Sequence, residues 1–159
     1  MGKNNLQISI ESVGPNHLCQ IFEIERLCFS DPWSPQSFLG EIANPNGVFL
    51  VACLGAEVLG FVLMWHIVNE GHILNIAVKP EYRRRGVADA LINGLEAAAI
   101  AKEIIALTLE VRLSNISARK LYEKHGFLDG GLRKNYYSNP TEDAIIMWKN
   151  LEVMGGSIN

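Results

Sequence analysis

The sequence has few cysteines, no long apolar run and no large excess of charge of either sign. Its three cysteines, Cys19, Cys28 and Cys53, form no C-x-x-C pair, and its four histidines follow no metal-ligand spacing. The apolar runs fall far short of the roughly 20 residues that cross a bilayer. The N-terminus has neither an apolar signal core nor a myristoylation pattern. We therefore expect a cytoplasmic protein with free thiols, no metal and no membrane contact.

The composition that is present belongs to a globular protein. Of 159 residues, 48% are hydrophobic and 19% are charged, which excludes a disordered or low-complexity chain. This length fits one domain that buries most of the surface of its unfolded chain. We expect that domain over residues 1–151, followed by a flexible tail at 152–159.

The charges are unevenly distributed, although the net charge is only −3. Residues 1–70 hold seven acidic and two basic side chains, whereas the remainder holds ten acidic and twelve basic ones. This asymmetry indicates two ligands of opposite charge that meet in one site, although scattered surface charge explains it equally well. If it is functional, Glu25, Asp31 and Glu41 belong to the side that receives a basic acceptor.

Hydrophobic periodicity and turn residues predict the order of secondary structure. The first helix should bury a stripe that includes Ile21, Ile24 and Leu27. The order of elements predicts one α/β or α+β layered domain. Strands are expected at 6–12, 48–54, 58–68, 72–78, 106–111, 127–134 and 144–150, and helices at 15–29, 35–42, 86–103 and 116–126.

The most informative segment joins the strand ending at Val78 to the helix beginning at Gly86. Its loop carries three arginines, and the helix starts at a glycine followed by small residues. A helix N-terminus attracts anions through its free N–H groups and dipole, and small residues let a diphosphate approach. The loop is therefore expected to bind pyrophosphate. It is neither a Walker loop nor a G-x-G-x-x-G dinucleotide motif. The net negative charge of the chain disfavours nucleic-acid binding.

Arg-x-x-Gly-x-Ala at residues 83–88 resembles the acetyl-CoA signature of the GCN5-related N-acetyltransferases (GNAT), with Ala88 in place of a common second glycine. The resemblance implies a single GNAT acyltransferase fold, a mixed central sheet flanked by helices, with acetyl-CoA as co-substrate. Further segments resemble the RimI-type N-terminal alanine acetyltransferases: Cys28-Phe29, Pro32-Trp33-Ser34, Leu109–Asn115, Leu121–Phe127, Arg133–Tyr137 and Glu142–Met147.

The resemblance implies cofactor contacts in three places. Ile76, Ala77 and Val78 would offer backbone groups to the pantetheine amides and the thioester carbonyl, although their apolar side chains alone indicate only a buried strand. Asn115 would contact pantetheine, but an asparagine just before a helix is also an ordinary N-cap. The remaining cofactor contacts are Arg84, Arg85, Gly86, Val87, Ala88 and Asp89.

Two residues are candidates for proton transfer. Glu110 lies in mid-strand on a polar face, where a salt bridge to Arg112 or another basic side chain is the structural alternative. By resemblance Glu110 is the general base, and an amine that attacks a thioester must lose a proton. By resemblance Tyr122 is the general acid for the departing thiolate, whereas an aromatic packed on the sheet is the other interpretation. Both roles of Tyr122 are compatible.

Aromatic residues are the candidate walls of a peptide groove. Phe29, Trp33, Tyr136 and Tyr137 fit that role by resemblance, although core packing explains Phe29 and Trp33 equally well. The implied substrate is the N-terminal alanine of small-subunit ribosomal protein eighteen. Other protein N-termini, lysine or a small-molecule amine are alternative acceptors, and a CoA-binding module without turnover is the alternative from another class. We expect a monomer or weak homo-oligomer.

Overall fold

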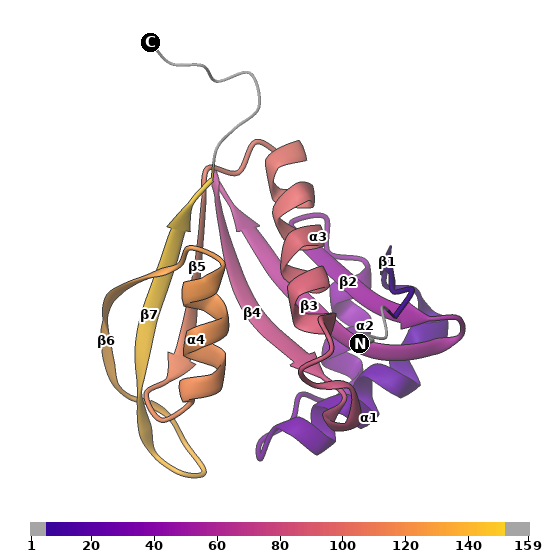
Figure 1. Cartoon of the computed structure of the whole chain (residues 1–159), viewed down its shortest axis with the longest axis horizontal. Coiled ribbons are helices and arrows are strands. Elements are labelled where there is room, and N and C mark those ends of the chain that lie inside the picture. Colours follow the sequence, from indigo (N-terminus) through magenta and orange to yellow (C-terminus); the bar gives the residue numbers. More distant parts are fainter. Residues whose placement is uncertain (1–5, 152–159) are drawn as a thin grey trace, which may run out of the picture. The chain divides into compact units, whose positions relative to one another are not determined.

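The computed structural model describes residues 6–151. Seven strands form one sheet in the order β1-β2-β3-β4-β5-β7-β6, accompanied by four α-helices (Figure 1). The sheet is mixed, because β4 and β5 pair in parallel while β5 and β7 pair antiparallel. The predicted fold class is therefore confirmed. The segment 152–159, expected as a flexible tail, lies outside the described residues.

The chain divides into two compact units. The first comprises Met1–Leu63 and Asn75–Leu95, and the second comprises Met64–Leu74 and Glu96–Asn159. Three elements, β3, β4 and α3, contribute residues to both units. The expectation that residues 1–151 form a single domain stays a prediction.

The first unit follows the predicted order of elements, although its first strand begins at Ser9 rather than residue 6. β1 pairs antiparallel with β2. Short 3-10 turns precede α1 and follow β4, at Pro15–His17 and Pro80–Tyr82. The elements are β1 (Ser9–Ser12), α1 (Leu18–Cys28), α2 (Pro35–Ile42), β2 (Gly47–Leu54), most of β3 (Glu57–Ile67), the end of β4 (Glu70–Val78) and most of α3 (Val87–Ala101).

An aromatic cluster forms part of the first unit's core. Phe38 of α2 is fully buried, and its ring lies 5.4 Å from that of Trp33 and 5.6 Å from that of Phe61. Such pairs contribute about 0.5–1.5 kcal/mol each beyond their buried area. The helix that carries Phe38 starts as predicted, because the Ser34 hydroxyl accepts a hydrogen bond from the Ser37 N–H at 3.2 Å.

The buried face of α1 differs from the prediction. Ile21 and Ile24 are buried as expected, but Leu27 is 60% exposed. The third buried residue of this helix is Glu25. Residues three or four apart share one helix face, which aligns Ile21, Glu25 and Cys28, and Leu27 lies beyond the edge of that face. The prediction for Leu27 was therefore wrong, because a carboxylate occupies the inward position.

The second unit contains the strand pairing around the other candidate residues. β4 runs parallel to β5 with His72 opposite Thr108, and β5 runs antiparallel to β7 with Glu110 opposite Ile146. Figure 1 shows β5, β7 and β6 side by side, as their pairing requires. The elements beyond β4 and α3 are β5 (Ala106–Arg112), α4 (Ile116–Lys124), β6 (Leu128–Tyr137) and β7 (Glu142–Asn150).

Two features of the second unit bear on the candidate site. β5 alternates as predicted, with Leu109 and Val111 buried while Glu110 is on the other face. β6 extends beyond the predicted end, because Tyr137 still pairs with Glu142 of β7. The longer strand carries Tyr137 into the sheet. Among the described residues, no helix is long and apolar enough to span a membrane.

Candidate active site

The carboxylate of Glu110 has two ionisable partners within the second unit. Its Oε1 lies 2.6 Å from Nε2 of His72, and its Oε2 accepts a hydrogen bond from Nε of Arg133 at 3.2 Å. The Glu110 side chain is only 8% exposed, so these partners replace much of its hydration. The alternative of a salt bridge to a basic side chain is therefore confirmed, but the partner is Arg133 rather than Arg112, which pairs with Glu142 at 3.1 Å.

His72 is a candidate site residue that sequence-based reasoning missed. It precedes Glu110 by 38 residues, and the parallel pairing of β4 with β5 brings the two together. Histidine is the side chain that most readily gains and loses a proton near neutral pH. In the sequence it is only the first residue of the strand expected at 72–78, and its half-burial and its partner emerge from the structure. Glu110 and His72 together form a pair able to accept a proton.

Tyr136 and Tyr137 lie close enough to Glu110 to feel its charge. Burial raises the pKa of both phenols, and the negative charge of Glu110 raises it further. The two rings are perpendicular with centroids 5.0 Å apart. The guanidinium of Arg112 lies 4.5 Å from the centroid of Tyr137 and holds that ring. The second unit thus groups three of the predicted residues, while their contact with an acceptor stays a prediction.

Tyr122 is buried on α4 and packs edge-to-face against Phe127 at 5.8 Å. Burial raises the pKa of its phenol, and interaction with Tyr137 raises it further. The hydroxyl therefore keeps its proton and can donate a hydrogen bond to a forming thiolate. The packing role is observed, and the role as general acid stays a prediction.

Asn115 caps α4. Its side-chain oxygen accepts a hydrogen bond from the Ala118 N–H at 3.1 Å. This is the N-cap interaction that the sequence allowed as an alternative to a ligand contact. The NH2 group of the Asn115 side chain is not used in this cap, and its contact with pantetheine stays a prediction.

The predicted pyrophosphate loop ends at the N-terminus of α3 in the first unit. The backbone is left-handed at Arg84, with φ 61°, and at Gly86, with φ 85°. The Ala90 N–H donates to the Gly86 carbonyl at 3.0 Å, which leaves the N–H groups of residues 87–89 without acceptors inside the helix. Such groups fit the pyrophosphate of a CoA ester. A Cβ at Gly86 would meet no atom within 4 Å, so backbone conformation rather than crowding requires glycine here.

The three arginines of the loop have different surroundings. Arg83 donates to the Cys28 thiol at 3.3 Å, and the Arg85 guanidinium lies 5.2 Å from the Tyr82 ring centroid. Arg84 is exposed. Asp89 lies in the first turn of α3, where a carboxylate stabilises the helix dipole. Cofactor contacts by Arg84, Arg85 and Asp89 stay predictions.

The end of β4 carries the other predicted cofactor residues. Ile76, Ala77 and Val78 are its last three residues. β3 approaches this strand closely at Gly60, because a Cβ there would lie 2.6 Å from the Ala77 carbonyl oxygen. The thiol of Cys28 donates to the Val78 carbonyl at 3.5 Å. Contact of this strand with pantetheine stays a prediction.

The two aromatic candidates of the first unit differ in exposure. Phe29 is partly exposed just after α1, whereas the ring of Trp33 stacks on Phe38. The Trp33 N–H donates to Oε2 of Glu25 at 3.0 Å. Core packing thus accounts for the Trp33 ring, and its backbone is tied to α1.

One expectation about charge is wrong. Glu25 is 1% exposed and hydrogen-bonded on both oxygens, so it cannot attract a basic peptide through solvent. Glu41 accepts a hydrogen bond from the Asn44 amide at 3.1 Å. Glu41, which is half-buried, and Asp31, which is exposed, remain candidates for that role.

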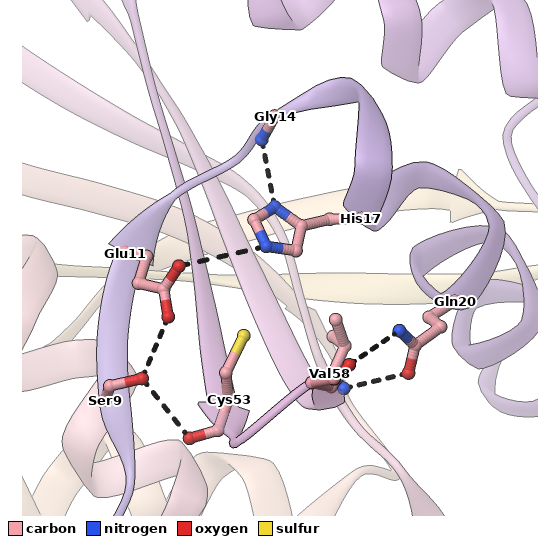
Figure 2. A network of polar contacts seen from close by, with 8 residues as sticks. Ser9, Glu11, Gly14, His17, Gln20, Cys53 and Val58 are labelled. Carbon is pink, nitrogen blue, oxygen red and sulfur yellow. Dashed lines mark hydrogen bonds and ion pairs between the residues drawn. The ribbon is translucent and has the colours of Figure 1, made fainter.

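Three possible metal ligands meet near β1, although their spacing in sequence gave no sign of it. The ligand atoms of Glu11, His17 and Cys53 lie within 4.8 Å of one another. Figure 2 shows the Gly14 N–H donating to Nδ1 of His17, at 2.9 Å. The neutral ring then carries its proton on Nε2, which faces Glu11 at 3.9 Å. A metal at Nε2 would displace that proton and the Gly14 bond, so the geometry supports a turn-capping role.

Comparison with known proteins assigns the family. Residues 18–127 match the sequence model of the acetyltransferase (GNAT) family. The chain belongs to the acetyltransferase (GNAT) family. The predicted resemblance to this family is thereby confirmed.

Similar proteins share most of the chain. One relative is a protein of Bacillus subtilis (strain 168) with the provisional name [ribosomal protein bS18]-alanine N-acetyltransferase. It is 40% identical over 129 residues, which cover 80% of this chain and 85% of that protein. The crystal structure of the Escherichia coli ribosomal-protein-S18-alanine N-acetyltransferase has TM-score 0.86 and 30% identity, covering 96% of this chain and 99% of that one. Arabidopsis thaliana NAA60, solved with acetyl-CoA, has the same fold with TM-score 0.83 and 20% identity, covering 91% and 98%.

Proposed function

We propose that this protein transfers the acetyl group of acetyl-CoA to the α-amine of the N-terminal alanine of ribosomal protein bS18. The names of the Bacillus subtilis and Escherichia coli relatives, which are 40% and 30% identical to this chain, support this acceptor. The observation that carries the chemistry is the Glu110 carboxylate, held 2.6 Å from Nε2 of His72. Bound acetyl-CoA supplies the activated acetyl group. We further propose a cytoplasmic monomer or weak homo-oligomer that needs no metal, nucleic acid or membrane.

Glu110 takes the proton that the attacking amine must lose. Transfer forms a bond between the amine nitrogen and the acetyl carbon and breaks the bond from that carbon to sulfur. The carboxylate accepts the proton, directly or through an ordered water, and His72 can share it. An α-amine has a pKa near 8, against about 10.4 for lysine, so a modest base serves an N-terminus better.

Tyr122 donates a proton to the departing sulfur. Burial raises the pKa of this hydroxyl, so it stays protonated near neutral pH and can hydrogen-bond to the sulfur as negative charge develops there. The proton collected at Glu110 later restores the phenol. The net reaction moves one proton from the amine to the CoA thiol, and the protein is unchanged.

Backbone groups orient the cofactor in this mechanism. The N–H groups of residues 87–89 hold the pyrophosphate at the start of α3, and the last residues of β4 hold the pantetheine amides. The acceptor contacts the aromatic candidates, which are Phe29, Trp33, Tyr136 and Tyr137. Exposed Asp31 favours acceptors with basic residues near the N-terminus.

The test compares three peptides with purified protein and acetyl-CoA. The first has the N-terminal sequence of bS18 starting with alanine, the second is the same peptide with a blocked N-terminus and a free lysine, and the third replaces nearby basic residues with neutral ones. We expect acetylation of the first peptide, none of the second, and slower acetylation of the third. The advantage of the first peptide over the third should shrink as salt is added. Mass spectrometry locates the acetyl group. Equal rates on the free and blocked peptides would refute the N-terminal assignment.

A further inference from the structure

We propose that Glu25 is a positioning residue for the acceptor, because its buried carboxylate fixes the segment 29–34 against the end of β4. The proposal rests on the proposed function, since this segment holds the acceptor candidates Phe29 and Trp33. Glu25 would act through Trp33 and would set the affinity for the acceptor peptide rather than the chemical step.

The first observation is the junction that the carboxylate makes. Its Oε2 accepts from the Trp33 N–H at 3.0 Å, and its Oε1 accepts from the Asn75 side-chain amide at 2.8 Å. The three residues come from α1, the segment before α2, and β4. One side chain thus joins three separate parts of the first unit.

The second observation is that burying the Glu25 carboxylate costs folding free energy. Glu25 is 1% exposed, and burial raises the pKa of its carboxyl despite the two hydrogen bonds. Both partners are neutral, so no opposite charge compensates for lost hydration. An apolar residue there would avoid this cost but would leave the Trp33 N–H and the Asn75 amide without their acceptor. The carboxylate therefore needs a task, and ordering Trp33 is the task its contacts show.

The third observation is a second attachment of α1 to the same strand. The Cys28 thiol, one helical turn after Glu25, donates to the Val78 carbonyl at 3.5 Å. The two contacts on β4, at Asn75 and Val78, bracket Ile76 and Ala77. The last turn of α1 is therefore anchored at both ends of the segment predicted to hold the thioester. A shift of residues 29–34 would be resisted at the strand itself.

Direct contact between Glu25 and the acceptor is excluded by burial. With almost no exposed surface, the carboxylate cannot reach a peptide bound from solvent. Its influence passes through the backbone of Trp33. The Trp33 ring is held separately by stacking on Phe38, with the ring centroids 5.4 Å apart. Removing the carboxylate oxygens of Glu25 would leave the Trp33 N–H without its hydrogen-bond partner and free the adjoining backbone.

The experiment pairs Glu25→Leu with the conservative Glu25→Gln. The leucine variant removes both acceptor atoms, so we expect the KM for an alanine-starting bS18 peptide to rise about tenfold or more. The KM for acetyl-CoA and kcat should change less than about twofold, since the Cys28 thiol still holds the last turn of α1 to the strand at Val78. Glutamine still accepts from the Trp33 N–H, and the Asn75 amide can rotate to accept from the new amide. Glu25→Gln should therefore retain most of the wild-type acceptor affinity.

Ile24→Val is the matched control. Ile24 is the neighbouring residue of α1 and equally buried at 1% exposure, but its side chain makes no polar contact. It should loosen the packing of the helix without changing the KM of the acceptor. Amide hydrogen exchange of Trp33, followed by NMR, should accelerate in Glu25→Leu and stay slow in Glu25→Gln and Ile24→Val. If Glu25→Leu does not fold, Glu25→Met removes the same acceptor atoms with a more adaptable side chain.

Two results would overturn the proposal. One is a folded leucine or methionine variant with an unchanged acceptor KM. The other is an equal rise in Ile24→Val, which would reduce Glu25 to a packing residue. Failure of the wild-type protein to acetylate the peptide would instead refute the proposed function. In that case Trp33 exchange still decides the positioning role, because slow exchange in Glu25→Leu contradicts it and rapid exchange supports it.

Discussion

The two compact units offer a ligand different kinds of groups. The candidate contacts of the first unit are mostly backbone, namely the N–H groups of residues 87–89 and the strand residues 76–78. Those of the second unit are side chains that can carry protons, Glu110, His72 and Tyr122. Backbone groups bind and orient but do not titrate near neutral pH. Changes to these backbone segments should therefore affect KM, and changes to these three side chains should affect kcat.

Each unit also holds a carboxylate with little exposure, and the contrast between them is instructive. Glu25 is bonded to two neutral amides, whereas Glu110 is bonded to His72 and Arg133. A neutral amide cannot exchange a proton at working pH, but an imidazole can. Burial alone therefore does not identify a catalytic carboxylate. The partners decide between a structural and a proton-transfer role.

The largest expected effect tests this contrast with one substitution made in both units. Glu110→Gln should lower kcat by roughly 10²–10⁴-fold, because the amide cannot accept a proton. Its KM for acetyl-CoA should be nearly unchanged. Glu25→Gln should leave kcat within about a factor of two. Steady-state rates with an alanine-starting peptide measure both, and a Glu110→Gln enzyme near wild-type turnover would remove this residue from the mechanism.

Tyr122→Phe should lower kcat by roughly 10–100-fold. The phenylalanine ring keeps the edge-to-face contact with Phe127, so the loss reports on the hydroxyl rather than on packing. An acetyl thioester with a more acidic leaving thiol should recover part of the rate, since its thiolate needs less help to depart. Equal losses with both thioesters would argue for a purely structural hydroxyl.

His72 sharpens the distinction between accepting a proton and merely holding a carboxylate. His72→Gln keeps a hydrogen-bond donor but cannot share a proton, whereas His72→Leu removes both abilities. We expect about a tenfold loss of kcat in each variant if the imidazole shares the proton. Near wild-type activity in the glutamine variant alone would assign His72 to orientation. Comparison of the two pH–rate profiles provides the measurement.

Gly86→Ala tests the backbone character of the first unit. The φ of 85° costs an L-residue about 1–2 kcal/mol, so acetyl-CoA affinity should fall about tenfold as the loop relaxes. kcat at saturating acetyl-CoA should be close to wild type. Calorimetric titration with acetyl-CoA gives the affinity, and an unchanged value in a folded variant would place the anion site elsewhere.

The smallest expected effect concerns stability at low pH. The Ser114 hydrogen bonds and the Arg112 guanidinium hold the pKa of Glu142 below its ordinary value of 4.5. A carboxyl whose pKa is lowered by folding stabilises the native state above its unfolded pKa, and this contribution is lost as pH falls through the folded pKa. Glu142→Gln should therefore be less stable than wild type at pH 7, with the gap closing in acid. Urea unfolding at several pH values checks this, and a constant gap contradicts it.

Local signals in the sequence predicted much of the fold, because they depend on neighbours in the chain. Ser34 and Pro35 start α2 as expected, and alternation on β5 placed Glu110 on its polar face. The contact of His72 with Glu110 could not be predicted in this way, since it depends on the register of β4 against β5. The burial of Glu25 was open to prediction from its helical alignment with Ile21. Its partners, however, depend on how distant segments pack.

The buried carboxylate of Glu25 has a consequence for directed evolution of this enzyme. Because burial raises the pKa of Glu25, its ionisation at neutral pH opposes folding. A library screened for heat resistance alone should therefore enrich glutamine at this position, because it removes the buried charge and keeps both hydrogen bonds. Apolar replacements also remove the charge but leave the Trp33 N–H without its partner, so those that survive heating should bind the peptide poorly. A screen that couples survival with acetylation of a dilute peptide would retain glutamate or glutamine.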